Sequence, residues 1–193
     1  MEPSAAFDAG IELAPFEESH FDLLIEWSPT AEFLLQWAGP ALGFPLDREQ
    51  IGRLLATGQG TPPEAHLFTA RRTHDGAVVG HGELGGLDRR NLNARLMRIL
   101  VAPSARGQGF GTDIVRELTR VGFEELGLHR LALNVFDFNH AAIRCYERAG
   151  FRLEGTLREA RRHQDDYWNV CTLGLLRSEW ENGGGSSAHG ATS

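Results

Sequence analysis

A glycine-rich segment, residues 106–111 (RGQGFG), lies between a strand-like run at residues 95–101 and a helical pattern at residues 109–126. Backbone N–H groups in such a turn point into one concavity, and a helix N-terminus adds a partial positive charge. Glycines permit positive φ angles and let the backbone approach a ligand closely. The segment therefore predicts a pyrophosphate cradle, beside which Arg106 supplies a cation.

Three known phosphate-binding patterns can be compared with this segment. A Walker loop ends in Gly-Lys-Ser/Thr, and residues 111–113 read Gly-Thr-Asp. A dinucleotide fingerprint is met at Gly107 and Gly109 but not at Thr112, and too little chain follows for repeated βαβ units. The coenzyme A pattern, Arg/Gln-x-x-Gly-x-Gly/Ala, is met at every fixed position of residues 106–111. A glycine-rich connection that binds nothing remains the alternative.

A second group of residues follows the next predicted strand. Asn139 suits the N-cap of a helix over residues 139–149. Tyr146 comes seven residues later, so both lie on one helix face about 10 Å apart. A tyrosine hydroxyl near a leaving thiolate can protonate it. An ordinary capped helix with a half-buried Tyr146 is the alternative, and the position after the cradle favours catalysis.

The surrounding pattern predicts a mixed α/β chain with short connections. Asp75-Gly76 is a hairpin signal between two strand-like runs, so an antiparallel meander is expected over residues 65–101. If strand 95–101 splays from strand 130–136, its free backbone groups could bind pantetheine amides. The other expected strands are 11–16, 151–154 and 168–176, and the other expected helices are 17–27, one capped by Ser28 and begun by Pro29, and 47–56.

Bulk properties fit a single domain over residues 1–180, with a flexible Gly/Ser-rich tail at 181–193. The net charge of −7 argues against a nucleic-acid partner. No apolar run is long enough for a membrane span, and the N-terminus lacks a signal-peptide pattern. Two cysteines without a Cys-x-x-Cys pair favour a reduced cytoplasmic location. The residues at 1–10 are expected to form a loose leader.

Residues 96–151 resemble the core of the GNAT acetyltransferases, and the resemblance extends over roughly residues 64–180, with the N-terminal third similar only in general layout. Residues 153–159 and 175–180 are similar to the branch that acetylates alanine N-termini of ribosomal proteins. The resemblance implies an α/β (α+β) GNAT fold, with a mixed, mostly antiparallel central sheet of about six to seven strands flanked by helices. It also implies acetyl-CoA as cosubstrate and direct transfer of the acetyl group to an amine in a ternary complex.

The resemblance assigns roles residue by residue. Asn139 would hold the pantetheine arm, and Tyr146 would be the general acid. The remaining acetyl-CoA contacts would come from Leu100, Val101, Arg106, Gly107, Gln108, Gly109, Phe110, Gly111 and Thr112.

The sequence departs from the family pattern at the position where a general base is expected. Many members carry a glutamate near the start of the strand before the cradle, but residues 93–98 contain no acid. Glu83 is the substitute candidate, and His81 shares its strand face. The alternatives are that both are solvated, that they bind the acceptor, or that water takes the proton. Two such residues do not make a metal site, and none is expected.

The acceptor remains open among protein N-termini, aminoglycosides, polyamines and amino acids. Trp27, Phe33 and Trp37 are more typical of a core than of a substrate cage, although the N-terminal helices should wall the acceptor site. The segment 158–168 is expected to be an exposed hairpin that either contacts the acceptor or is only solvated. A homodimer through edge strands, a non-catalytic acetyl-CoA-binding module and a nucleotide-binding domain are the other hypotheses.

Overall fold

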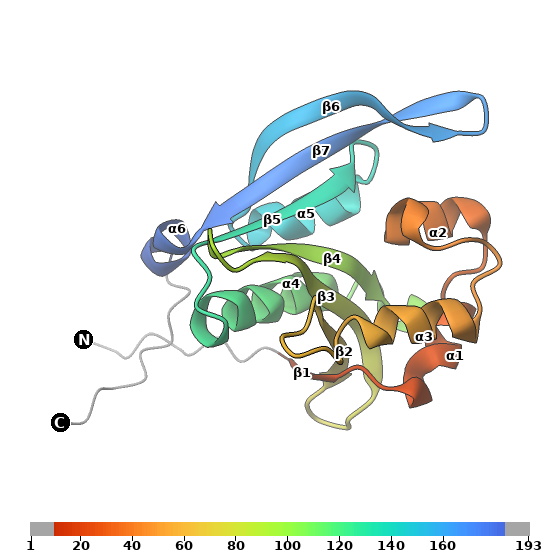
Figure 1. The fold of residues 1–193 in the computed structure, drawn as a ribbon, viewed down its shortest axis with the longest axis horizontal. Helices are drawn as coiled ribbons and strands as arrows, with labels where there is room; N and C mark the ends of the chain where they lie inside the picture. Colours follow the sequence, from red (N-terminus) through yellow and green to blue (C-terminus); the bar gives the residue numbers. More distant parts are fainter. Residues whose placement is uncertain (1–9, 184–193) are drawn as a thin grey trace.

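The computed structural model describes residues 10–183. Its centre is a seven-stranded sheet in the order β1-β2-β3-β4-β5-β7-β6 (Figure 1). The strands are β1 (Ile11–Pro15), β2 (His66–Arg72), β3 (Val78–Asp88), β4 (Asn93–Val101), β5 (Arg130–Phe136), β6 (Arg152–His163) and β7 (Asp166–Leu176). The helices are α1 (Phe21–Glu26), α2 (Ala31–Ala38), α3 (Arg48–Ala56), α4 (Phe110–Arg120), α5 (His140–Arg148) and α6 (Arg177–Asn182).

The sheet is mostly antiparallel, as the sequence predicts. The meander β2-β3-β4 forms, and Gly76 takes the positive φ of 70° that its hairpin turn needs. β4 and β5 are the single parallel pair among the described strands, because the chain crosses over through α4 between them. The strands β4 and β5 and the crossover helix α4 therefore meet at the middle of the sheet.

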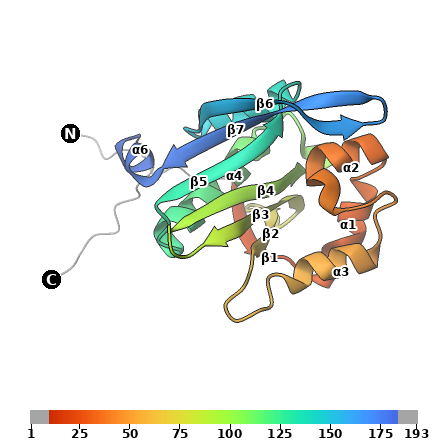
Figure 2. The ribbon, with the colours of Figure 1, turned by 45° about the horizontal axis from the view of Figure 1, so that its top comes forward.

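One face of the sheet is covered by α4, with α5 beside it (Figures 1 and 2). The apolar stripe of α4 is fully buried at Ile114 and Leu118. Gly80 and Gly82 of β3 allow this helix to approach closely. A Cβ at these positions would lie 2.6 Å from Ile114 Cδ1 and 2.8 Å from Leu118 Cδ1. The side chains at positions 81 and 83, which alternate with these glycines along β3, therefore point to the opposite face.

The N-terminal helices α1 to α3 gather at one end of the molecule, where α2 contacts β4 (Figure 2). Asp47 caps α3 as predicted, accepting from the Gln50 N–H at 2.8 Å. The predicted cap of α2 was wrong. Thr30 caps it, accepting from the Phe33 N–H at 3.1 Å, because Ser28 is 3% exposed and lies before the helix.

The C-terminal strands form a long hairpin whose tip lies beside α2 in both views (Figures 1 and 2). β6 is longer than the predicted strand 151–154, because its pairing with β7 continues to His163. Its residues are almost all exposed, so its sequence lacks the apolar alternation that marks a strand. α6 runs two residues past the predicted boundary at 180, and the rest of the predicted tail and residues 1–9 lie outside the described residues.

Within residues 10–183, none of the helices has the length and apolar character needed to cross a membrane.

Candidate active site

The site begins where β4 and β5 separate. Their parallel pairing covers three positions, from Asn93↔Arg130 to Arg95↔Ala132, although both strands continue well beyond. β4 also carries a bulge, because His81 pairs with Leu100 but Glu83 pairs with Met97. Arg98 lies in this bulge with a φ of 47°. The splay between the two strands is thus present.

A cavity of about 610 Å³ fills this splay. Its walls come from α2, β4, the cradle, α4, β5 and α5. The volume lies in the range of small-molecule sites. Its charged lining consists of Arg98, Arg106, Arg144 and Arg148, and the described lining contains no carboxylate. An anionic ligand therefore fits this cavity.

The cradle has the backbone geometry expected of residues 106–111. Gly107 and Gly109 have φ angles of 76° and 95°, and a Cβ at either would meet no atom within 4 Å. Glycine is therefore needed at these two positions for its backbone conformation, and the space in front of both residues is open. α4 begins directly after Gly109, so its first N–H groups point out of the helix end. This arrangement suits a pyrophosphate.

The side chains of the predicted cofactor residues divide into two groups. Arg106 is held in place, because its Nε donates to the Val101 carbonyl at 3.3 Å and its guanidinium lies 5.3 Å from the Phe33 ring centroid. Gln108 instead turns back to donate to the Ser104 carbonyl at 3.0 Å, and Phe110 is buried in the core. The predicted residues on the cavity wall are Leu100, Val101, Arg106, Gly107, Gly109, Gly111, Thr112 and Asn139.

α5 brings Asn139 and Tyr146 to the same wall. Asn139 is the N-cap, and its Oδ1 accepts from the Ala142 N–H at 3.2 Å. The Tyr146 ring packs edge-on against Phe151 with centroids 6.4 Å apart. Burial raises the pKa of the Tyr146 hydroxyl, and the neighbouring Cys145 raises that pKa further. The hydroxyl therefore keeps its proton at neutral pH, as a proton donor must.

Glu83 and His81 share a face as predicted, but they are buried rather than solvated. Glu83 Oε1 lies 3.0 Å from His81 Nε2, and Glu83 Oε2 accepts from Arg98 Nη1 at 2.6 Å. Their exposed fractions are 0% and 1%, and the His81 ring packs against Phe16. Arg98 lies between this pair and the cavity. Both oxygens of Glu83 are thus engaged behind the cavity wall.

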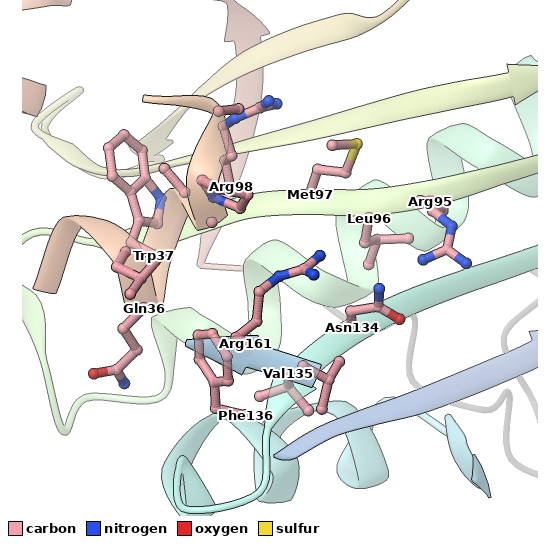
Figure 3. Close-up of a pocket in the computed structure, with 16 residues that line it drawn as sticks. Gln36, Trp37, Arg95, Leu96, Met97, Arg98, Asn134, Val135, Phe136 and Arg161 are labelled. Atoms are coloured by element: carbon pink, nitrogen blue, oxygen red, sulfur yellow. The ribbon is translucent and has the colours of Figure 1, made fainter. Parts of the chain in front are cut away.

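A smaller cavity of about 250 Å³ adjoins the first, and Figure 3 shows the residues that line it. The two share lining residues from α2, β4 and β5, including Trp37, Arg98 and Asn134. Arg161 of β6 reaches into it from the exposed hairpin that the sequence predicts over residues 158–168 (Figure 3). Trp37 and Phe33 are wall residues, whereas Trp27 belongs to the core. A second reactant can therefore approach the first cavity from this side.

The sequence profile of the acetyltransferase (GNAT) family matches residues 14–151. The chain belongs to this family. The match includes the last two residues of β1 and the N-terminal helices, where the resemblance was one of general layout only, and it continues through the cradle and α5. The GNAT fold predicted from the sequence is confirmed.

Relatives of this GNAT protein include the SPbeta prophage-derived uncharacterized N-acetyltransferase YokL of Bacillus subtilis, 31% identical over 107 residues (55% of this chain, 60% of that protein). Spermidine N(1)-acetyltransferase of Vibrio cholerae is 32% identical over 85 residues (44% and 49%). The chain thus spans about half of the curated relatives' length. The crystal structure of Vibrio cholerae spermidine N-acetyltransferase with CoA and spermine superposes with a TM-score of 0.79 at 21% identity, covering 91% of this chain and 100% of that one.

Sequence reasoning missed several wall residues of this GNAT protein. Arg144 and Arg148 are one helical turn apart on α5, and this spacing was a signal that could have been used. Asn134, Arg98 and Arg161 carried no such signal. Their positions depend on the splay, the bulge and the hairpin, which are tertiary features.

Proposed function

We propose that this protein is an N-acetyltransferase that moves an acetyl group from acetyl-CoA to a primary amine. The observation that carries this proposal is the pair of adjoining cavities at the β4–β5 splay, with the cradle at one side and Arg161 at the other. The larger cavity would bind acetyl-CoA. The smaller one would admit the amine, so both reactants would meet without a covalent enzyme intermediate.

The chain's own residues suit this cosubstrate. Arg106, Arg144 and Arg148 offer guanidinium groups to phosphates, and guanidinium–phosphate contacts are strong and directional. Asn139 uses its Oδ1 in the helix cap, which leaves its amide N–H groups for a pantetheine carbonyl. The backbone of β4 beyond Arg95 has no β5 partner and would pair with the pantetheine amides.

In the proposed reaction, the amine nitrogen bonds to the thioester carbonyl carbon, and the carbon–sulfur bond breaks. Backbone N–H groups at the splay would polarise the carbonyl. Tyr146 would give its proton to the departing thiolate, and the high pKa from its burial keeps that proton available.

We propose that Glu83 positions Arg98 rather than touching the amine. Its carboxylate is fully buried, and both oxygens are engaged by His81 and Arg98. Water in the smaller cavity would then take the amine proton. This assignment favours the water alternative among the candidate bases that the sequence left open.

The acceptor, the location and the assembly state are part of the proposal. The ribosomal-protein branch favours a protein N-terminus, whereas the Vibrio cholerae neighbour was solved with spermine. A cytoplasmic location fits the two unbridged cysteines, Cys145 and Cys171. The exposed outer strand β6, with Leu153 and Leu157 about 60% exposed, is a candidate dimer edge that sedimentation would test.

Calorimetric titration with acetyl-CoA, NAD and ATP tests the proposal. Micromolar binding of acetyl-CoA alone supports it, and an amine screen then tests transfer. Acetyl-CoA binding without transfer to any amine would favour the non-catalytic module. Preferential binding of NAD or ATP would favour a nucleotide-binding domain and contradict the proposal.

A further inference from the structure

The smaller cavity has a charge opposite to that of the whole chain. The sequence contains 26 acidic and 19 basic residues, giving a net charge of −7. The charged residues that line the cavity are nevertheless Arg95, Arg98 and Arg161, with no carboxylate among its described lining residues. A positive cavity in an acidic protein selects its ligand by charge, because cavity walls concentrate the local field.

Two of these three arginines keep their charge uncompensated. Arg98 is neutralised by Glu83 at 2.6 Å. Within residues 10–183, neither Arg95 nor Arg161 has a carboxylate within ion-pair distance. Arg161 Nη1 donates to the Ala160 carbonyl at 3.0 Å, which leaves its other N–H groups for a ligand.

Their placement suits one bound molecule. Arg95 comes from β4 and Arg161 from β6, and both side chains extend toward the gap between β4 and β5 (Figure 3). Trp37, Leu96 and Asn134 line both this cavity and the larger one. A molecule whose anionic end contacts the arginines can therefore place its other end at the junction of the two cavities.

We propose that the acceptor is an amine that also carries a carboxylate, with the carboxylate bound by Arg95 and Arg161 and the amine at the junction. The inference rests on the proposed acetyl transfer. A guanidinium binds a carboxylate through paired hydrogen bonds, whereas a polyamine would be repelled. Positive surroundings also favour the neutral form of the amine, which is the nucleophilic form.

This chemistry occurs in a free amino acid and in a peptide with an acidic first residue. The volume of about 250 Å³ suits an end group of this size. The two sources share the amine and the carboxylate, so the experiment must distinguish them. It must also separate acceptor binding from acetyl transfer.

Acceptor binding is measured first, by calorimetry on the protein saturated with CoA, which has no acetyl group to transfer. The probes are L-glutamate, a tetrapeptide amide beginning with glutamate, the same peptide beginning with lysine, and spermidine. We expect glutamate or the glutamate peptide to bind at least tenfold more tightly than spermidine. Tighter binding of free glutamate would identify the amino acid as the source, and tighter binding of the peptide would identify a protein N-terminus.

Arg161→Ala and Arg95→Ala should each weaken binding of the acidic probe by about 10- to 100-fold, the loss expected for a hydrogen-bonded charged contact. Arg162→Ala is the matched control, since Arg162 is the next residue of β6 and bonds to Gln164 instead. Binding of spermidine should not weaken in either variant. Arg161→Glu should improve spermidine binding.

Turnover is measured second, as release of CoA thiol from acetyl-CoA with the same probes. Acidic-probe binding that depends on Arg161 without turnover would refute the proposed transfer and leave the anion subsite in place. Tighter binding of spermidine or the lysine peptide, or acidic-probe binding unchanged by Arg161→Ala, would overturn the inference.

Discussion

Tyr146→Phe separates proton donation from every other contribution of Tyr146. The substitution keeps the ring that packs against Phe151 and removes the hydroxyl alone. Among the described residues that hydroxyl has no hydrogen-bond partner, and it is buried, so its loss should not lower the free energy of unfolding. The effect should therefore fall on the chemical step.

The expected loss is about 100-fold in kcat, the lower part of the range for general acid catalysis. It corresponds to roughly 2.7 kcal/mol of transition-state stabilisation. The Kd for acetyl-CoA should not change, because the cradle and Asn139 are untouched. In the wild type, the raised pKa of Tyr146 should keep the proton donor active above pH 10, the ordinary value for tyrosine.

The assay is steady-state release of CoA thiol from acetyl-CoA and an accepted amine, with acetyl-CoA affinity from calorimetry. Tyr167→Phe is the matched control, since Tyr167 is the other tyrosine of the chain and is 55% exposed on β7. A Tyr146→Phe enzyme with unchanged kcat would refute the role of the hydroxyl. A large rise in the Kd for acetyl-CoA would assign Tyr146 to binding instead.

Three further predictions concern the buried ion pair and the cofactor cavity. Glu83→Gln should lower the free energy of unfolding by about 3 kcal/mol in urea titrations, because Arg98 loses a buried partner, and an unchanged midpoint would contradict this. Gly109→Ala should weaken acetyl-CoA binding, because φ is 95° there, whereas Gly76→Ala, strained at φ 70° in a distant turn, should not. Arg148→Ala should raise the Kd for acetyl-CoA about tenfold and reduce its salt dependence, and a Kd equal to wild type would exclude Arg148 from phosphate binding.

Local patterns were sufficient to predict most of the elements. The stripe at Ile114 and Leu118 predicted α4, and the Asp75-Gly76 turn predicted the β2–β3 hairpin, because each signal lies within a few residues. The length of β6 could not be predicted from local patterns. Its residues are exposed on both faces, and its length follows from pairing with β7.

The candidate site likewise contains features that local patterns predict and features that depend on tertiary structure. The cradle and the Asn139–Tyr146 helix were predicted, since spacing within one turn or one helix defines each. The partnership of Glu83 with Arg98 was not, because it depends on a bulge in β4 that brings together residues 15 positions apart. Arg161 could not be assigned to a cavity until the β6–β7 hairpin was placed beside α2. The proposed charge selection at the acceptor side therefore depends on the tertiary fold and not on a local sequence pattern.

In the proposed function, the two adjoining cavities bring acetyl-CoA and an amine together for direct transfer. Isotope-labelled acetyl-CoA, incubated with the protein and a panel of amines, tests it most directly. We expect label on the amine in equal amount to the CoA released, with the rate lowered about 100-fold in Tyr146→Phe. Tight binding of acetyl-CoA with no label on any amine would contradict it.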